Sequence, residues 1–125
     1  MTLTIHRGTH ESGGRCVEIR TDKAKILIDL GMPLDYDKHT TEEQTQIRSD
    51  AAEWCKGADA RLLSHAHADH YGFLCLLPQD TPIYATEETF AMLALDKIGA
   101  RPISRMVNDI GCNLYICHLA RLPAF

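Results

Sequence analysis

Three histidines and one aspartate lie within six consecutive positions near the middle of the chain, directly after the apolar run 60–64. The cluster reads His65-Ala66-His67-Ala68-Asp69-His70. Imidazole and carboxylate are ligands that Zn²⁺ and similar ions accept, and a catalytic zinc keeps one position open. Residues two apart in an extended segment project to the same side, so His65 and His67 are predicted to bind one metal at a strand end. Asp69 and His70 are predicted to lie in the following turn and to face a second metal.

Two metal ions at such a cluster clamp the attacking and the leaving oxygen atoms of a hydrolytic displacement. The expected reaction is therefore hydrolysis by a metal-bound hydroxide, with Asp69 orienting or deprotonating the water. The expected cofactor is Zn²⁺, two ions per complete site, with Mn²⁺ as the alternative. A histidine that stands alone is more often an ordinary hydrogen-bonded residue, and this interpretation is preferred for His6, His39 and His118 taken singly.

The rest of the chain alternates between strand and helix patterns, which favours an α/β layered arrangement. Thr41 to Gln44 fits a capping box, so a helix is predicted from Thr41 to about Gly57. A second helix is predicted over 87–98, and a helical turn over 71–77. Strands are predicted over 2–7, 16–20, 25–30, 60–63, 81–85 and 113–119.

Three stretches resemble the metallo-β-lactamase fold hydrolases. The histidine cluster after an apolar strand is similar to the signature of that family. Residues 8–19, from Gly8 to Ile19, resemble the entry loop and second strand of the branch that contains ribonuclease J and the β-CASP nucleases, which process RNA and DNA ends. Residues 26–33 resemble its next motif, a strand that ends in an aspartate, here Asp29. The resemblance covers residues 1 to about 95.

This resemblance implies the N-terminal half of an αββα sandwich, with a mixed, mostly antiparallel sheet flanked by helices. It implies that the metal ligands are His65, His67, Asp69 and His70. A carboxylate at a strand end is often only a turn former. In the family, however, the matching aspartate orients the histidine loop by hydrogen bonds, so Asp29 is expected to support the ligands and not to bind metal.

The chain has 125 residues, 45% of them hydrophobic, which is enough for one domain with a core. Full family members carry a second αβ half with the remaining ligands: a third histidine for the first metal, a bridging aspartate and a final histidine. The expectation is a single partial domain over 1–125, recognisable to residue 95. His118 is a candidate for the third histidine, but the interpretation against it is preferred. Cys112 and Cys117 do not form a recurrent zinc pattern with it, so free cysteines are preferred.

Three functions stay open at this stage, and whether the chain alone is an enzyme is left open with them. The first is nuclease-type phosphodiester hydrolysis. The second is hydrolysis of thioesters, lactones or β-lactams on the same fold, because fold does not fix substrate. The third is a truncated, non-catalytic fragment that binds metal. The net charge of −4 gives no basic field for nucleic acid, so RNA or DNA as substrate is supported by the resemblance alone.

Location and association follow from composition and from the expected missing half. The sequence shows no apolar run long enough to cross a bilayer and no signal-peptide pattern, so a cytoplasmic protein is expected. Five cysteines without CxxC spacing favour reduced thiols. An apolar sheet face without its covering half predicts self-association. A clean, compact monomer in size-exclusion chromatography would contradict that prediction.

Overall fold

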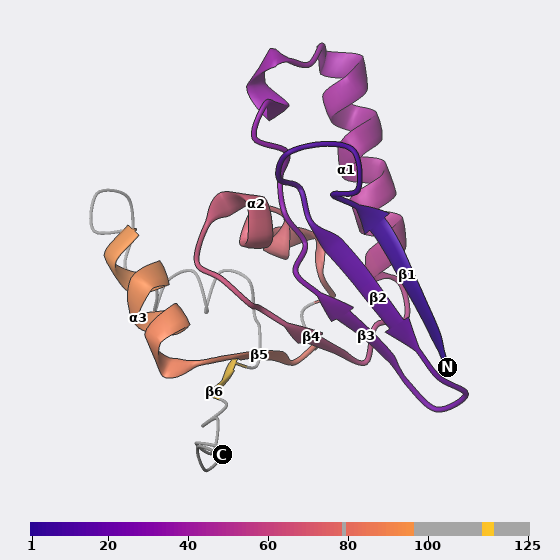
Figure 1. Cartoon of the computed structure of the whole chain (residues 1–125), viewed down its shortest axis with the longest axis vertical. Coiled ribbons are helices and arrows are strands. Elements are labelled where there is room, and N and C mark those ends of the chain that lie inside the picture. The colour runs from indigo at the N-terminus through magenta and orange to yellow at the C-terminus, as the bar shows by residue number, and fades with distance from the viewer. Residues whose placement is uncertain (79, 97–113, 117–125) are drawn as a thin grey trace.

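The computed structural model describes residues 1–78, 80–96 and 114–116, and within them six strands form one mixed sheet (Figure 1). Each strand lies beside its neighbour in sequence, in the order β1-β2-β3-β4-β5-β6. The strands are β1 Thr2–Arg7, β2 Cys16–Arg20, β3 Lys25–Ile28, β4 Ala60–Leu62, β5 Ile83–Ala85 and β6 Leu114–Ile116. The strands therefore form where they are predicted. β1 and β2 have the predicted bounds, β3, β4 and β5 are one or two residues shorter, and β6 covers 114–116 of the predicted 113–119.

The direction of pairing changes across the sheet. β1, β2 and β3 pair antiparallel, whereas β3 with β4, β4 with β5 and β5 with β6 pair parallel. The mixed α/β arrangement is confirmed, but the expectation of a mostly antiparallel sheet is wrong for the described strands. The reason is the connections: helical segments join β3 to β4 and β4 to β5, and a crossover that carries a helix returns the chain in the same direction.

The helical elements alternate with the later strands along the chain. In space, α1 lies beside the β1–β3 end of the sheet and α3 lies near the other end (Figure 1). They are η1 Tyr36–Lys38, α1 Thr41–Cys55, α2 Ala68–Tyr71, η2 Leu74–Leu76 and α3 Glu87–Asp96. The capping box of α1 is formed by Thr40 and Glu43, whose side chains each accept a hydrogen bond from the other's backbone N–H. The box predicted at Thr41 is therefore wrong by one residue, because Thr40 stands three positions before Glu43.

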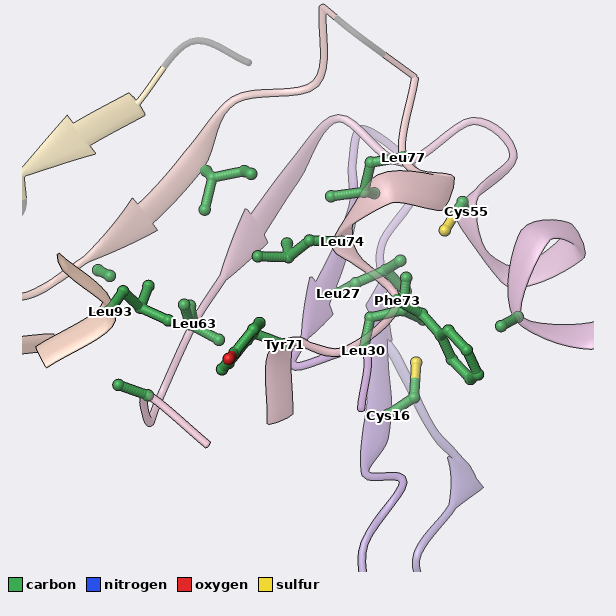
Figure 2. Packing of buried hydrophobic residues seen from close by; sticks show 14 of the residues in the cluster. Cys16, Leu27, Leu30, Cys55, Leu63, Tyr71, Phe73, Leu74, Leu77 and Leu93 are labelled. Carbon is green, nitrogen blue, oxygen red and sulfur yellow. The ribbon is translucent and has the colours of Figure 1, made fainter. Parts of the chain in front are cut away.

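The inner face of the sheet carries the core. Glu18, Leu27, Arg61 and Ile83 lie opposite one another on β2 to β5, and all four are buried. Side chains from the helical elements cover this row, and Figure 2 shows leucines and Phe73 packed there with two cysteines from β2 and α1. The core contributors from the helical elements include Ile47, Ala51, Cys55, Leu74 and Leu93.

The outer face of the same strands is apolar and only partly buried. Ile5, Val17, Ile28, Leu62 and Tyr84 lie opposite one another in one row across β1 to β5. Ile5 is 51% exposed and Leu62 is 40% exposed. Self-association through this face stays a prediction. In the part of the chain that the structure describes, no helix has the length and apolar character needed to span a membrane.

Candidate metal centre

The histidine cluster begins three residues after the end of β4. His65 lies in the irregular segment after β4, and His67 is the extended N-cap of α2, which contains Asp69 and His70. The prediction that Asp69 and His70 lie in a turn before a helix from residue 71 is therefore wrong, since the helix begins within the cluster. Gly72 directly follows α2. Its N–H donates to Ala68 O at 2.7 Å, and a Cβ there would lie 2.5 Å from that oxygen, so glycine permits this tight end of the helix.

Asp29 is buried beneath the cluster and accepts three hydrogen bonds. Its Oδ1 accepts from Ser64 N at 2.9 Å, and its Oδ2 accepts from Ser64 Oγ at 2.6 Å and from His70 Nδ1 at 2.8 Å. A carboxylate only accepts, so Nδ1 of His70 carries the proton and Nε2 is left as the binding atom of the ring. That Nε2 lies 3.5 Å from Asp69 Oδ2.

The backbone of Asp29 has φ +58°, a left-handed conformation that few residues other than glycine adopt. Aspartate is among the residues that tolerate it, because the short side chain bonds locally. Asp29 N donates to Leu62 O at 2.9 Å, which fixes the aspartate against β4. The strained conformation therefore places the carboxylate under Ser64 and His70.

The backbone of α2 is held by the loops that precede α1. A helix of four residues leaves its last carbonyls without partners within the helix. Here three successive carbonyl groups accept from the segment 15–32. The bonds are Met32 N to Ala68 O (3.0 Å), Arg15 N to Asp69 O (3.1 Å) and Leu30 N to His70 O (2.8 Å). The position of Asp69 and His70 is thus set by residues far away in sequence.

Two glycines permit this close approach. A Cβ on Gly31 would lie 1.6 Å from Asp69 O, closer than any side chain allows. Gly13 has φ +80°, and a Cβ there would lie 3.0 Å from Asp69 Cβ. Both glycines fall in stretches that carry the family resemblance, and the contacts with Asp69 give a physical reason for glycine at both.

His65 and His67 form a second pair with different surroundings. Nε2 of His65 lies 2.9 Å from Nδ1 of His67, and the ring centroids are 4.2 Å apart. The His65 ring also lies edge-on to the His70 ring, with centroids 5.3 Å apart. His67 is exposed and His65 is half-buried. The two halves of the cluster are therefore adjacent. Asp69 and His70 are hydrogen-bonded to residues outside the cluster, whereas the rings of His65 and His67 contact each other.

The donor atoms suit a divalent ion in kind, since imidazole and carboxylate are ligands for Zn²⁺ and Mn²⁺. Among residues 1–78, 80–96 and 114–116, however, no three such side chains converge on one point. A catalytic zinc normally has three protein ligands. The described residues thus offer candidate ligands in two pairs, His65 with His67 and Asp69 with His70. His118, Cys112 and Cys117 lie outside the described residues.

Two buried cysteines, Cys16 and Cys55, belong to the hydrophobic core. Burial raises the pKa of Cys16 to about 12 and that of Cys55 to about 11, although the nearby Arg61 guanidinium acts in the opposite direction. Metal binding and nucleophilic attack require the thiolate. Both thiols therefore stay protonated at neutral pH and act as core side chains.

Sequence reasoning did not identify two residues that contact the cluster. Ser64 bonds Asp29 through its backbone and its hydroxyl. Arg61, on β4, is fully buried and donates from Nη2 to His70 O at 3.1 Å. The available signals were the position of Ser64 beside the first histidine and a charged residue within a short apolar strand.

The sequence of this chain is similar to those of several archaeal proteins. No protein-family model matches this chain. Over 90 residues the chain is 38% identical to "Probable RNase MJ4" of Methanocaldococcus jannaschii, which covers 70% of this chain and 19% of the relative. It is 37% identical over 70 residues to an "RNase J-like protein" of the same organism, covering 56% and 14%. It is 31% identical over 107 residues to "Transcription termination factor FttA" of Cenarchaeum symbiosum, covering 80% and 16%. The chain thus spans less than a fifth of each relative's length.

Solved structures share the fold. A quorum-quenching N-acyl homoserine lactone lactonase superposes with a TM-score of 0.56 and 23% identity, covering 83% of this chain and 44% of the lactonase. A diphosphatase of the PhnP family superposes with a TM-score of 0.50 and 20% identity, covering 90% and 40%. At these identities the likeness shows the fold alone.

Proposed function

Because the chain has the metallo-β-lactamase fold and a sequence similar to the RNase J-like branch of that fold, we propose that it carries part of the centre of a metal-dependent hydrolase that cleaves phosphodiester bonds. The names of the archaeal relatives support RNA as the substrate class, with DNA as the alternative. The chain spans 19%, 14% and 16% of those three relatives, so the activity of a whole relative enters here as part of the proposal.

One observation carries the proposal: the hydrogen bond from His70 Nδ1 to the buried carboxylate of Asp29 at 2.8 Å. Histidines that bind metals generally donate their other ring N–H to a carboxylate or carbonyl group, which fixes the tautomer and the ring orientation. A surface histidine needs no such support. Two further hydrogen bonds, from the backbone N–H and the hydroxyl of Ser64, fix Asp29 in turn.

In this proposal His65 and His67 form one ligand pair, and Asp69 and His70 form the other. Zn²⁺ or Mn²⁺ bound there supplies Lewis-acid activation of water and offsets charge on the phosphate oxygens. Asp29 keeps the proton of His70 on Nδ1. Asp69 orients the attacking water or accepts its proton.

The test is a panel of chromogenic substrates, one phosphodiester against one ester, one lactone and one thioester, assayed with added Zn²⁺ or Mn²⁺. We expect hydrolysis of the phosphodiester that depends on metal and is lost in Asp69→Asn. The matched control is Asp50→Asn, a change of the same kind on α1, away from the cluster. Hydrolysis of the ester, lactone or thioester without the phosphodiester would contradict the proposed substrate class and favour another hydrolase of this fold.

A second candidate is a metal-binding module without catalysis. It is favoured by the finding that no three ligand side chains converge within the described residues. Metal binding that depends on His65 and His67 but supports no hydrolysis of any substrate in the panel would establish this function over the first.

A further inference from the structure

Arg61 is an unusual residue for the centre of a sheet. It lies on β4, opposite Leu27 on β3 and Ile83 on β5, and it is fully buried. Burying a guanidinium is costly unless hydrogen bonds compensate for the lost water. A buried guanidinium therefore needs hydrogen-bond acceptors within the protein.

One acceptor of this guanidinium belongs to the histidine cluster. Nη2 of Arg61 donates to His70 O at 3.1 Å, and Leu30 N donates to the same oxygen at 2.8 Å. The backbone of Arg61 is itself fixed, since its N–H donates to Pro82 O at 2.9 Å within the sheet. The bond thus runs from a central strand of the sheet to the single turn of α2.

We propose that Arg61 is a positioning residue of the His65–His70 cluster, whose buried guanidinium fixes the backbone of His70 so that its ring meets Asp29. The His70 N–H donates to His67 O at 2.8 Å, so the residue is held at its N–H, its carbonyl and its ring. Asp29 orients the ring, whereas Arg61 and Leu30 orient the backbone that carries it. This role goes beyond the ligand set and rests on the proposed function only for its effect on metal affinity.

A different role for Arg61, as activator of a neighbouring thiol, is not supported. The guanidinium lies near Cys16 and Cys55, but burial outweighs it and the pKa of both thiols is raised. The thiols therefore do not form an ion pair with Arg61 at neutral pH. The carbonyl of His70 is the acceptor through which Arg61 reaches the cluster.

Lys25 provides a matched control. It is also a buried cation on the inner side of the sheet, 6% exposed, but its Nζ donates to Lys56 O at 2.8 Å, after the end of α1. Removing either charge disturbs the core. Only the removal of Arg61 is expected to disturb His70.

The experiment compares Arg61→Met with Lys25→Met in the full chain, without metal. The exchange rate of the His70 Nδ1–H is measured by NMR, and zinc affinity is then measured by titration. We expect exchange to be faster by about tenfold in Arg61→Met and unchanged in Lys25→Met, because a bond that holds His70 is lost only in the first. Zinc affinity should fall by about 10- to 100-fold in Arg61→Met alone.

If the exchange rate of the His70 Nδ1–H is the same in Arg61→Met and Lys25→Met, the proposal is overturned, whether or not that rate differs from the wild type. If Arg61→Met does not fold, the pair Arg61→Lys and Lys25→Arg replaces it. A smaller acceleration in Arg61→Lys alone is then expected, and equal exchange in the two would overturn the proposal. If the wild-type chain binds no zinc, the proposed function fails, while the exchange rates in the metal-free chain still test Arg61.

Discussion

The two halves of the histidine cluster are separated by one residue, Ala68, and differ in how they are held. Asp69 and His70 lie on α2, where the carboxylate of Asp29 and a set of backbone N–H groups fix them. His65 and His67 precede α2, and their side chains bond each other. One half of the site is therefore held by residues outside the histidine and aspartate ligands, most of them before α1, whereas the side chains of the other half contact each other.

The largest expected effect comes from removing the carboxylate that holds the Asp69 and His70 half of the cluster. Asp29→Ala removes the acceptor of three hydrogen bonds and leaves an alanine at φ +58°, so we expect a loss of about 4 kcal/mol in the free energy of unfolding. His65→Ala with His67→Ala is the matched comparison and should change it by no more than about 0.5 kcal/mol. Urea denaturation measures both. Equal losses would remove the distinction between the two halves.

A methyl group at Gly31 tests the backbone contact that holds the same half. Gly31→Ala places a Cβ 1.6 Å from Asp69 O, so the segment or α2 must shift, and a loss of about 3 kcal/mol is expected. Gly57→Ala is the control, because a Cβ there meets nothing within 4 Å although φ is +67°. Thermal unfolding compares the two. A smaller loss in Gly31→Ala than in Gly57→Ala would show that the close approach is not as described.

Ser64 gives a smaller and more specific perturbation. Ser64→Ala removes the hydroxyl bond to Asp29 Oδ2 and keeps the backbone bond to Oδ1, so a loss of about 1 kcal/mol is expected. Ser64→Thr retains a hydroxyl and should restore most of that stability. Denaturation of the two variants side by side is the measurement, and an Ala variant as stable as wild type would exclude a supporting role for the hydroxyl.

Acid titration tests a buried ionic contact on the inner face of the sheet, at Glu18 and not in the histidine cluster. Burial acts to raise the pKa of Glu18, but hydrogen bonds from His6, Arg20 and Lys25 outweigh it and lower the pKa to about 2 from an ordinary 4.5. A depressed pKa stabilises the folded state fully above pH 4.5, and this contribution is lost as the pH falls towards 2. Glu18→Gln should flatten this part of the stability curve. Denaturation midpoints between pH 5 and 2 measure it, and parallel curves for the two proteins would contradict this assignment.

The sequence was most informative where local chemistry decides the structure. The alternation in Thr2–Arg7 and the capping pattern before α1 are local features of the sequence, so these elements were predictable to within a few positions. The early start of α2 was not predictable. It depends on Met32, Arg15 and Leu30, whose N–H groups reach the carbonyls of α2 from distant positions.

Contacts between segments that come together only in the folded chain could not be predicted from the sequence either. The hydrogen bond of Arg61 to His70 requires β4 and α2 to be packed together. The parallel pairing of β3 with β4 follows from a crossover through α1, and it became evident only in the sheet. The resemblance supplied the place of Asp29, while its three bonds and its left-handed backbone come from the structure.

Elemental analysis of the purified chain, beside the variant His65→Ala with His67→Ala, decides whether these residues form a metal centre. A metal centre at this cluster predicts near-stoichiometric zinc or manganese in the wild-type chain and a loss of that metal in the variant. Metal in the wild type no higher than in the variant would contradict a metal centre formed by these residues.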